Sequence, residues 1–282
     1  MRKKFKSMRG AYDIFGKTRR RCLTENAPKI LQLLFTRKTI RRFKPTQVVD
    51  AVVQKIVEAG QRAPSACNLQ TYTIIWISNP QRRKRVLDAC GVSTVTAPVI
   101  LVICADVRRL GKTLDSLGFD HCLEHGYGNS LKLLSIVDAA LAAENMTIAA
   151  ECYGLGSLFI GSALANQKLC EILKVPEGVL PLSLLCIGRP DEEPPTRPRL
   201  PLSSILQINE YRDASPETIK SYLQHMDYKL DEEGYYQKYG DRKLDYHYTN
   251  HIKGKTDPDS MKREDREIEQ VLKKKGFLLE KP

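Results

Sequence analysis

The apolar stretch from Asp138 to Ser162 is the segment around which the rest of the chain is organised. Its first part, residues 138–153, is rich in Ala and Leu and contains no Gly or Pro, which predicts a helix. Because apolar residues surround almost the whole helix, we expect it to be buried against more than one neighbour. Gly154 and Gly156 then end the helix, and residues 157–160 form an apolar strand or turn. The glycines fit either a helix C-cap or a close approach of the backbone to a flat ligand.

Elsewhere the hydrophobic pattern predicts short helices that alternate with strands. Helical spacing or composition is found at residues 30–35, 48–61, 80–90, 167–173, 216–228 and 263–274. Runs of β-branched, aromatic or other apolar residues predict strands at residues 72–77, 97–105 and 182–187. Residues 111–135 are glycine-containing and lack a regular pattern, so we expect little order there.

Composition places the chain among ordinary globular proteins. With 282 residues, 42% of them hydrophobic and 28% charged, it is long enough for one or two domains. No run approaches the ~20 apolar residues of a membrane helix, so no membrane partner is expected. We divide the chain into a basic flexible tail (residues 1–28), a main domain (29–208) and a polar, tyrosine-rich helical extension (209–282). The basic start lacks an apolar stretch and a cleavage site, so a cytoplasmic location is expected.

The net charge of +12 suggests a nucleic-acid-binding protein at first sight. However, the excess lies largely in residues 2–21, 82–85 and 273–275, and none of these clusters belongs to a recognisable DNA- or RNA-binding module. Basic surfaces also attract phosphorylated small molecules. We therefore expect no nucleic-acid partner.

The chain contains a histidine pair and eight cysteines that could serve as metal ligands. His121 and His125 stand four positions apart, which would place them on one face of a helix. No third ligand has suitable spacing, so a mobile flap is favoured over a zinc site and no metal is expected. The eight cysteines form no CxxC motif and several lie in apolar runs, which predicts buried, reduced thiols.

Three polar segments contain candidate binding groups. Residues 36–43 are densely cationic, which fits either a solvated helix end or an anion site built on Arg37 and the Thr39 hydroxyl. Residues 63–70 form a small, polar loop before a strand, which is equally consistent with a binding loop and a surface turn. Arg197 and Arg199 flank a proline in a rigid segment, where they suit an anion or serve as linker charges.

Taken together and in this order, these segments resemble the nitroreductase superfamily of flavin enzymes, over residues 31–206. The family's Arg-x-Ser-x-Arg/Lys-x-Phe segment is matched by residues 37–43, and its Pro-Ser-x-x-Asn-x-Gln loop by residues 64–70. Its Ala-rich helix ending in Gly-Leu-Gly-Ser is matched by residues 138–157, and its Lys/Arg-Pro-Arg-Leu-Pro segment by residues 197–201. Thr39 replaces the usual Ser and keeps the hydroxyl, whereas Thr71-Tyr72 replaces the common Pro-Trp. A Rossmann motif is excluded, because the third glycine of the sequence GLGSLFIG comes too late and the motif follows a helix.

The resemblance implies an α+β, three-layer fold with a mixed, mainly antiparallel sheet wrapped by helices. It also implies a homodimer that binds FMN non-covalently at the subunit interface. In that arrangement, the FMN phosphate contacts four residues, which are Arg37, Thr39, Arg197 and Arg199. Arg41 would face the pyrimidine end of the flavin, and Ser65, Asn68 and Gln70 would come from the other subunit. The complete set of implied cofactor-binding residues is Arg37, Lys38, Thr39, Arg41, Pro64, Ser65, Asn68, Gln70, Leu155, Gly156, Ser157, Arg197 and Arg199.

The family reaction is a ping-pong hydride transfer from NADPH or NADH, through flavin N5, to nitroaromatic, quinone or flavin acceptors. Such a reaction requires no side-chain nucleophile, so we assign no catalytic residue. The alternatives are a non-catalytic flavin- or nucleotide-binding sensor and a basic nucleic-acid-binding protein. The C-terminal extension more loosely resembles that of the larger, NADPH-preferring group. There Lys253 and Lys255, in a basic loop, are hypothetical contacts for the NADPH 2′-phosphate, with a solvated loop as the favoured alternative.

Overall fold

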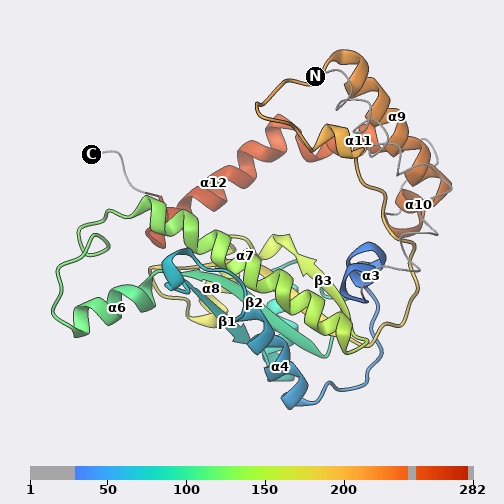
Figure 1. The fold of residues 1–282 in the computed structure, drawn as a ribbon. Helices are drawn as coiled ribbons and strands as arrows, with labels where there is room; N and C mark the ends of the chain where they lie inside the picture. The colour runs from blue at the N-terminus through green and yellow to red at the C-terminus, as the bar shows by residue number, and fades with distance from the viewer. Residues whose placement is uncertain (1–28, 241–245, 279–282) are drawn as a thin grey trace.

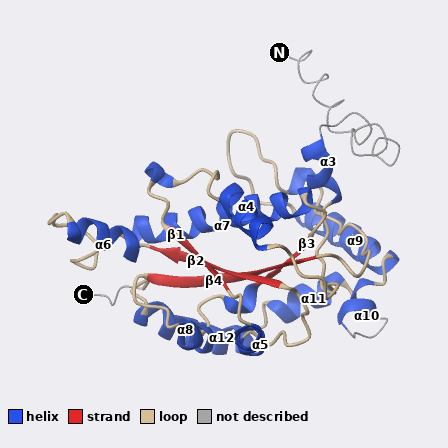
Figure 2. Cartoon of the chain, turned by 90° about the horizontal axis from the view of Figure 1, so that it is seen from below, coloured by secondary structure: helices blue, strands red, loops and turns tan. Residues whose placement is uncertain are grey.

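A four-stranded antiparallel sheet forms the middle layer of the protein (Figures 1 and 2). The computed structural model describes residues 29–240 and 246–278, so the predicted tail at residues 1–28 lies outside the described residues. The strands are β1 (Tyr72–Trp76), β2 (Val99–Asp106), β3 (Gly156–Ile160) and β4 (Val179–Gly188), in the order β1-β2-β4-β3. All three strand pairings are antiparallel, and a parallel contact occurs at the isolated bridge between Thr39 and Ser157. The α+β prediction is confirmed.

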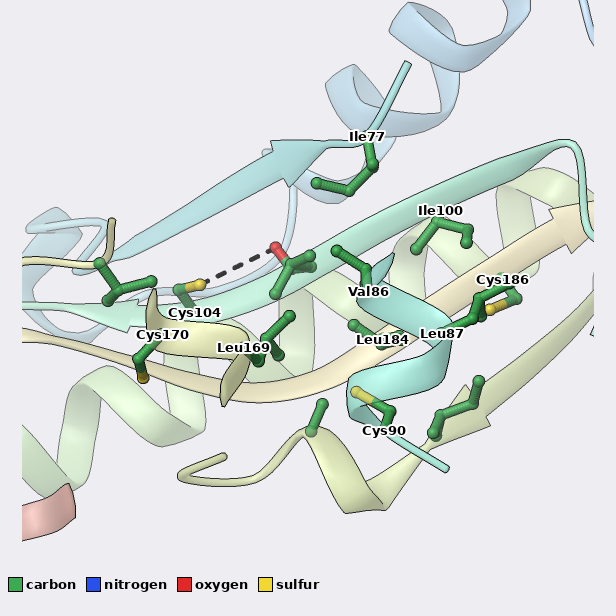
Figure 3. Packing of buried hydrophobic residues seen from close by; sticks show 14 of the residues in the cluster. Ile77, Val86, Leu87, Cys90, Ile100, Cys104, Leu169, Cys170, Leu184 and Cys186 are labelled. Carbon is green, nitrogen blue, oxygen red and sulfur yellow. Dashed lines mark hydrogen bonds between the residues drawn. The ribbon is translucent and has the colours of Figure 1, made fainter. Parts of the chain in front are cut away.

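Helices cover both faces of this sheet. One face carries α5 (Pro80–Ala89), α8 (Gln167–Leu173) and α12 (Pro258–Lys274), and the other carries α4 (Asp50–Gly60) and α7 (Asn129–Cys152) (Figure 2). Every residue of β2 is buried, because the strand lies centrally and is covered on both sides. This double coverage explains why β2 and β4 have continuous apolar sequences rather than alternating ones. Figure 3 shows the α5 and α8 side of the core, where Val86 and Leu169 pack near Ile100 and Leu184.

The remaining helices lie at the edges of this three-layer body. They are α3 (Lys29–Thr36), α6 (Arg108–Ser116), α9 (Pro216–Glu232), α10 (Tyr235–Gly240) and α11 (Tyr248–Lys255). Helices α9 to α11 stand beside the body, and α12 returns from them to its surface (Figure 1). The predicted division between residues 208 and 209 stays a prediction.

Helix α7 is the central helix, and it is longer than the sequence pattern predicts. It begins at Asn129 rather than Asp138. The sequence gives no sign of this start, because the N-cap residue is Gly128, which has a left-handed conformation (φ 94°) and no capping side chain. Its inner side is buried against the sheet and α4 through the small residues Ala139 and Ala143 and through Met146. By length and composition alone, α7 also meets the requirement for a membrane span, although 44% of its apolar window is buried inside the protein. The expectation that no run approaches that length is therefore wrong.

The end of α7 confirms the C-cap interpretation for one of its glycines, Gly154. The Leu155 N–H donates to the Ala150 carbonyl (3.0 Å) and the Gly154 N–H to the Glu151 carbonyl (2.9 Å), while Gly154 has a φ of 66°. This is the bonding pattern of a Schellman C-cap. Gly156 has a different role, because a Cβ atom at this position would lie 2.4 Å from Cγ1 of Ile40. Gly156 therefore allows the cationic segment to lie directly against β3.

Several other sequence predictions are corrected by the structure. Residues 111–135 are more ordered than expected, since they include most of α6 and the first two turns of α7. Lys253 and Lys255 lie in the last turn of helix α11 rather than in a loop, which removes the reason for placing the NADPH 2′-phosphate there. Helices α10 and α11 are too short and too polar to show a clear apolar period.

The cysteines divide into a buried and an exposed group. Four of them are buried: Cys90, Cys104, Cys170 and Cys186. Burial raises the pKa of Cys90 to about 11 and that of Cys104 and Cys186 to about 12, so these thiols stay protonated at neutral pH. The prediction of buried thiols is wrong for the three exposed cysteines, which are Cys67, Cys122 and Cys152. Cys22 lies outside the described residues.

The close contact at Gly156 generates a stability prediction. We expect Gly156→Ala to lower the free energy of unfolding by about 1–3 kcal/mol, because the added methyl group overlaps Ile40 in a packed interior. Gly161→Ala is the matched control, since a Cβ there meets nothing within 4 Å, and it should change stability by less than about 0.5 kcal/mol. Urea unfolding measures both, and equal effects of the two substitutions would contradict the packing argument.

Candidate functional site

The cationic segment at residues 37–43 lies in an extended conformation beside the start of β3. Thr39 pairs with Ser157 in a parallel bridge, and the Ile40 N–H donates to the Ser157 carbonyl at 3.0 Å. The side chains of Ile40 and Phe43 are buried, with exposed fractions of 5% and 4%. These two apolar side chains fix the segment on the body, and they hold Arg37, Thr39 and Arg41 at one end of the sheet.

Nε of Arg37 and Oγ of Ser157 are among the buried polar atoms of this region that have no hydrogen-bond partner among the described residues. Ser157 is fully buried. Arg37 is mostly buried beside Glu151 of α7, with 3.8 Å between Nε and Oε1. Burial raises the pKa of Glu151, and the charge of Arg37 partly opposes this rise. Unsatisfied buried donors are uncommon in proteins, so these atoms are candidate contacts for a bound ligand.

The C-terminal extension reaches the same region through Tyr235. The Arg41 guanidinium donates to the Tyr235 hydroxyl at 3.5 Å, and Cζ of Arg197 lies 3.6 Å from the Tyr235 ring centroid. Arg197 also pairs with Glu233, with 2.7 Å between Nη1 and Oε2. Arg41 and Arg197 are thus brought to the same tyrosine. Arg199 is exposed, and its guanidinium donates to the Pro198 carbonyl.

The loop at residues 64–70 is held by one carboxylate on α7. Asp138 accepts hydrogen bonds from the Ser65 hydroxyl (2.8 Å), the Ala66 N–H (2.9 Å) and both the N–H and hydroxyl of Thr71 (3.2 and 3.0 Å). Burial by itself would raise the pKa of Asp138, but these four hydrogen bonds outweigh it and lower the pKa below its ordinary value. Asp138 is therefore an ionised anchor for the loop.

The backbone of this loop is strained. Cys67, Asn68 and Gln70 have φ values of 49°, 57° and 52°, which are uncommon for residues other than glycine. Such conformations persist only where the surrounding contacts impose them, and they are concentrated at functional sites. The binding-loop interpretation is thereby favoured over an ordinary surface turn.

The loop and the cationic segment lie at different positions along α7. Asp138 and Glu151, which mark them, are 13 positions apart on this helix. At about 1.5 Å per residue, the separation is about 20 Å. One chain therefore does not bring the two groups of predicted site residues together.

The histidine pair does not form the arrangement that a helical spacing would give. Residues 117–128 are turns and coil, so the two imidazoles do not share a helix face. His121 contacts Asp115 (2.9 Å), and His125 contacts Asp120 (2.5 Å). Each histidine has Glu124 nearby as a third possible ligand. However, Nδ1 of His121 accepts the Glu124 N–H at 3.3 Å, which keeps the proton on Nε2 and disfavours metal ligation there.

Sequence reasoning missed several residues that organise the site. Asp138 was named only as the start of the apolar stretch, and Glu192, Glu233 and Tyr235 were not connected to the cationic segment. Their partners are distant in sequence, at separations from 36 to 194 residues, so no local pattern identifies them. The one usable signal was Asp138 itself, because an acid inside an apolar helix needs polar partners when it is buried.

Comparisons with known proteins agree with the motif analysis. The family model described as the nitroreductase family matches residues 34–189, and that of the nitroreductase family C-terminal domain matches residues 197–280. An FMN reductase [NAD(P)H] of Bacillus subtilis is 33% identical over 207 residues, covering 72% of this chain and 82% of that protein. An NADPH-flavin oxidoreductase of Vibrio harveyi is 30% identical over 200 residues, covering 70% and 80%.

Solved structures show the same fold. The hypothetical oxidoreductase YcnD from Bacillus subtilis superimposes with a TM-score of 0.78 at 29% identity, covering 90% of this chain and all of that one. The NADPH:FMN oxidoreductase from Vibrio harveyi, complexed with NAD+, superimposes with a TM-score of 0.72 at 26% identity, covering 88% and 98%.

The bonding of Asp138 generates a prediction with a pH dependence. We expect Asp138→Asn to destabilise the protein by about 2 kcal/mol or more, because an amide cannot accept all four hydrogen bonds. Since folding lowers the pKa, the ionised carboxylate contributes stability above the ordinary value of about 3.9, and this contribution is lost as pH falls through the folded pKa. Denaturant unfolding should show a full difference near pH 7 that shrinks below about pH 4.

The control for this prediction is Glu144→Gln, a substitution of an exposed acid on the same helix. It should leave stability nearly unchanged at both pH values. A difference between wild type and Asp138→Asn that does not depend on pH would contradict the role of the ionised carboxylate.

Proposed function

The chain belongs to the nitroreductase family, and on this premise we propose that it is an oxidoreductase that binds FMN non-covalently and uses NAD(P)H as reductant. The observation that carries the proposal is the cationic segment fixed beside Ser157, where Nε of Arg37 and Oγ of Ser157 are buried without a hydrogen-bond partner among the described residues. A phosphate or flavin oxygen would satisfy such donors. When bound, FMN supplies the hydride chemistry, taking two electrons from NAD(P)H and passing them to an acceptor.

The residues present fit the FMN phosphate. Arg37 and Thr39 lie on the same segment as Arg41, and Arg41 and Arg197 both contact Tyr235. We assign the phosphate to these residues together with Lys38 and Arg199. In this chain Arg37, Lys38 and Arg197 are balanced by the carboxylates of Glu151, Glu193 and Glu233, so a bound phosphate enters a site with compensated charge.

We assign Arg41 to the pyrimidine end of the flavin, where reduction places negative charge. Leu155, Gly156 and Ser157, at the start of β3, face the flavin edge in this proposal, with backbone N–H groups as donors. Pro64, Ser65, Asn68 and Gln70 form the opposing wall. No side chain acts as a nucleophile, and the residues bind and orient the reactants and exclude water.

The second subunit is part of the proposal. The loop at residues 64–70 and the cationic segment lie about 20 Å apart along α7, which is too far for contact with one isoalloxazine ring. The outer side of α7 is an exposed apolar stripe formed by Leu133, Leu134, Val137 and Leu141. We propose that a second copy covers this stripe and brings its loop to the cationic segment of the first, in a symmetric dimer.

The acceptors follow from the same proposal. A site built to bind a flat flavin, with no catalytic side chain aimed at the reactant, suits flat electron-poor molecules such as nitroaromatics, quinones or free flavin. The first test is the visible spectrum of the purified protein, followed by anaerobic addition of NADPH. A flavin spectrum that bleaches supports an enzyme. Bound flavin that fails to bleach would favour a non-catalytic sensor.

The phosphate assignment generates a binding prediction. We expect Arg37→Ala to weaken FMN binding about 10- to 100-fold, because charge-assisted hydrogen bonds contribute about 1.5–3 kcal/mol each. Lys44→Ala is the control, since Lys44 is an exposed cation close by that is outside the assigned set. Quenching of FMN fluorescence on titration of the FMN-free protein measures both constants. Equal weakening by the two substitutions would indicate only a general loss of positive charge.

The dimer generates a separate prediction. We expect Val137→Asp to give a monomer in sedimentation velocity and to release FMN, because it places a charge in the apolar stripe of α7. Lys84→Asp on α5, at the opposite face of the sheet, should leave both the dimer and FMN in place. A Val137→Asp monomer that retains FMN would contradict a site shared between subunits.

A further inference from the structure

The turn after β4 forms a short ladder with the cationic segment. The Lys44 N–H donates to the Arg189 carbonyl (2.9 Å), and the Asp191 N–H donates to the Arg42 carbonyl (3.0 Å). Phe43 pairs with Pro190 in an isolated antiparallel bridge. The backbone N–H groups of Arg41 and Arg42 come next along this ladder.

Glu192 bonds these two N–H groups through its side chain. Its Oε1 accepts from the Arg41 N–H at 2.5 Å and from the Arg42 N–H at 3.1 Å. Its Oε2 lies 3.5 Å from Nε of Arg42, and the side chain is only 7% exposed. Hydrogen bonds to an ionised acceptor are about twice as strong as neutral ones. A buried carboxylate that contacts two consecutive amides therefore fixes the backbone at Arg41.

Arg41 is the residue whose position depends on this contact. Its guanidinium reaches Tyr235 of the C-terminal extension, which in turn lies against Arg197. The neighbouring acid, Glu193, is different, since its side chain is 83% exposed and pairs with Lys38 at the surface. Surface ion pairs of this kind contribute little to fixing a geometry.

We propose that Glu192 is a positioning residue of the flavin site, which acts by fixing the backbone from which Arg41 reaches the pyrimidine end of FMN. The proposal rests on the proposed function. Glu192 itself does not contact the cofactor in this arrangement. Its carboxylate takes the place of backbone carbonyl acceptors for the Arg41 and Arg42 N–H groups of this ladder.

The test is a double-substitution cycle on FMN binding, measured by fluorescence quenching of added FMN. We expect Glu192→Ala to weaken binding about tenfold or more, and Glu192→Gln to restore most of it, because a Gln side-chain oxygen accepts the same two N–H groups. The double variant Glu192→Ala/Arg41→Ala should bind no more weakly than Arg41→Ala alone, since both act through one side chain.

Several outcomes would overturn the proposal. If the two losses multiply in the double variant, Glu192 acts on the site independently of Arg41. If Asp191→Ala, the exposed neighbouring control, weakens binding as much as Glu192→Ala does, the effect is one of local charge. Urea unfolding of each FMN-free variant distinguishes a loss of folding from a changed position of Arg41. Glu192→Gln still tests the proposal if Glu192→Ala does not fold. Wild-type protein that binds no FMN would instead contradict the proposed function.

Discussion

A helix that is apolar on nearly every side has to be covered on nearly every side, and α7 is covered on only one. Its inner surface packs on the sheet and on α4, and the small side chains of Ala139 and Ala142 allow close contact. Its outer stripe, from Leu133 to Leu141, stays exposed in the single chain. Because Asp138 holds one part of the candidate site and Glu151 contacts the other, this helix sets both their separation and their orientation. In the dimer that we propose, covering the stripe and completing the site are one event.

The cationic site shows how a cluster of like charges is tolerated before a ligand binds. Arg37, Lys38, Arg42 and Arg197 each have a carboxylate within ion-pair distance, and three of these carboxylates, Glu151, Glu192 and Glu233, are largely buried. Removing one partner of a buried pair leaves an uncompensated charge, which is strongly destabilising. The acids therefore stabilise the folded arrangement, and the arginines keep donors available for an anion. Compensation of this kind is invisible in the sequence, where the segment shows only its excess of positive charge.

A feature of the fold or of the candidate site could be predicted where neighbouring residues in the sequence determine it. The end of α7 was predictable because Gly154 provides the left-handed C-cap, whereas its start was not, because Gly128 caps it without a side chain. The motif residues from Arg37 to Arg41 were found, and the structure places them on one extended segment beside Ser157. The loop's strain was hidden, since Cys67 and Gln70 are residue types that rarely adopt a positive φ. Lys253 and Lys255 were misplaced because a short polar helix has no apolar period.

The C-terminal extension contacts both the region of the candidate site and the opposite side of the sheet. At one end Met226, Leu230 and Tyr236 form a small cluster that packs against Leu200 and Tyr235. At the other end α12 inserts Val271 into the main core, and the Lys275 ammonium donates to the Val175 carbonyl on the far side of the sheet. A segment anchored at both ends loses less freedom when a ligand orders it than a free tail would. The contact of Tyr235 with Arg41 and Arg197 is thereby held by the main core as well as by local packing, and in the function that we propose the extension is a preformed wall of the phosphate site.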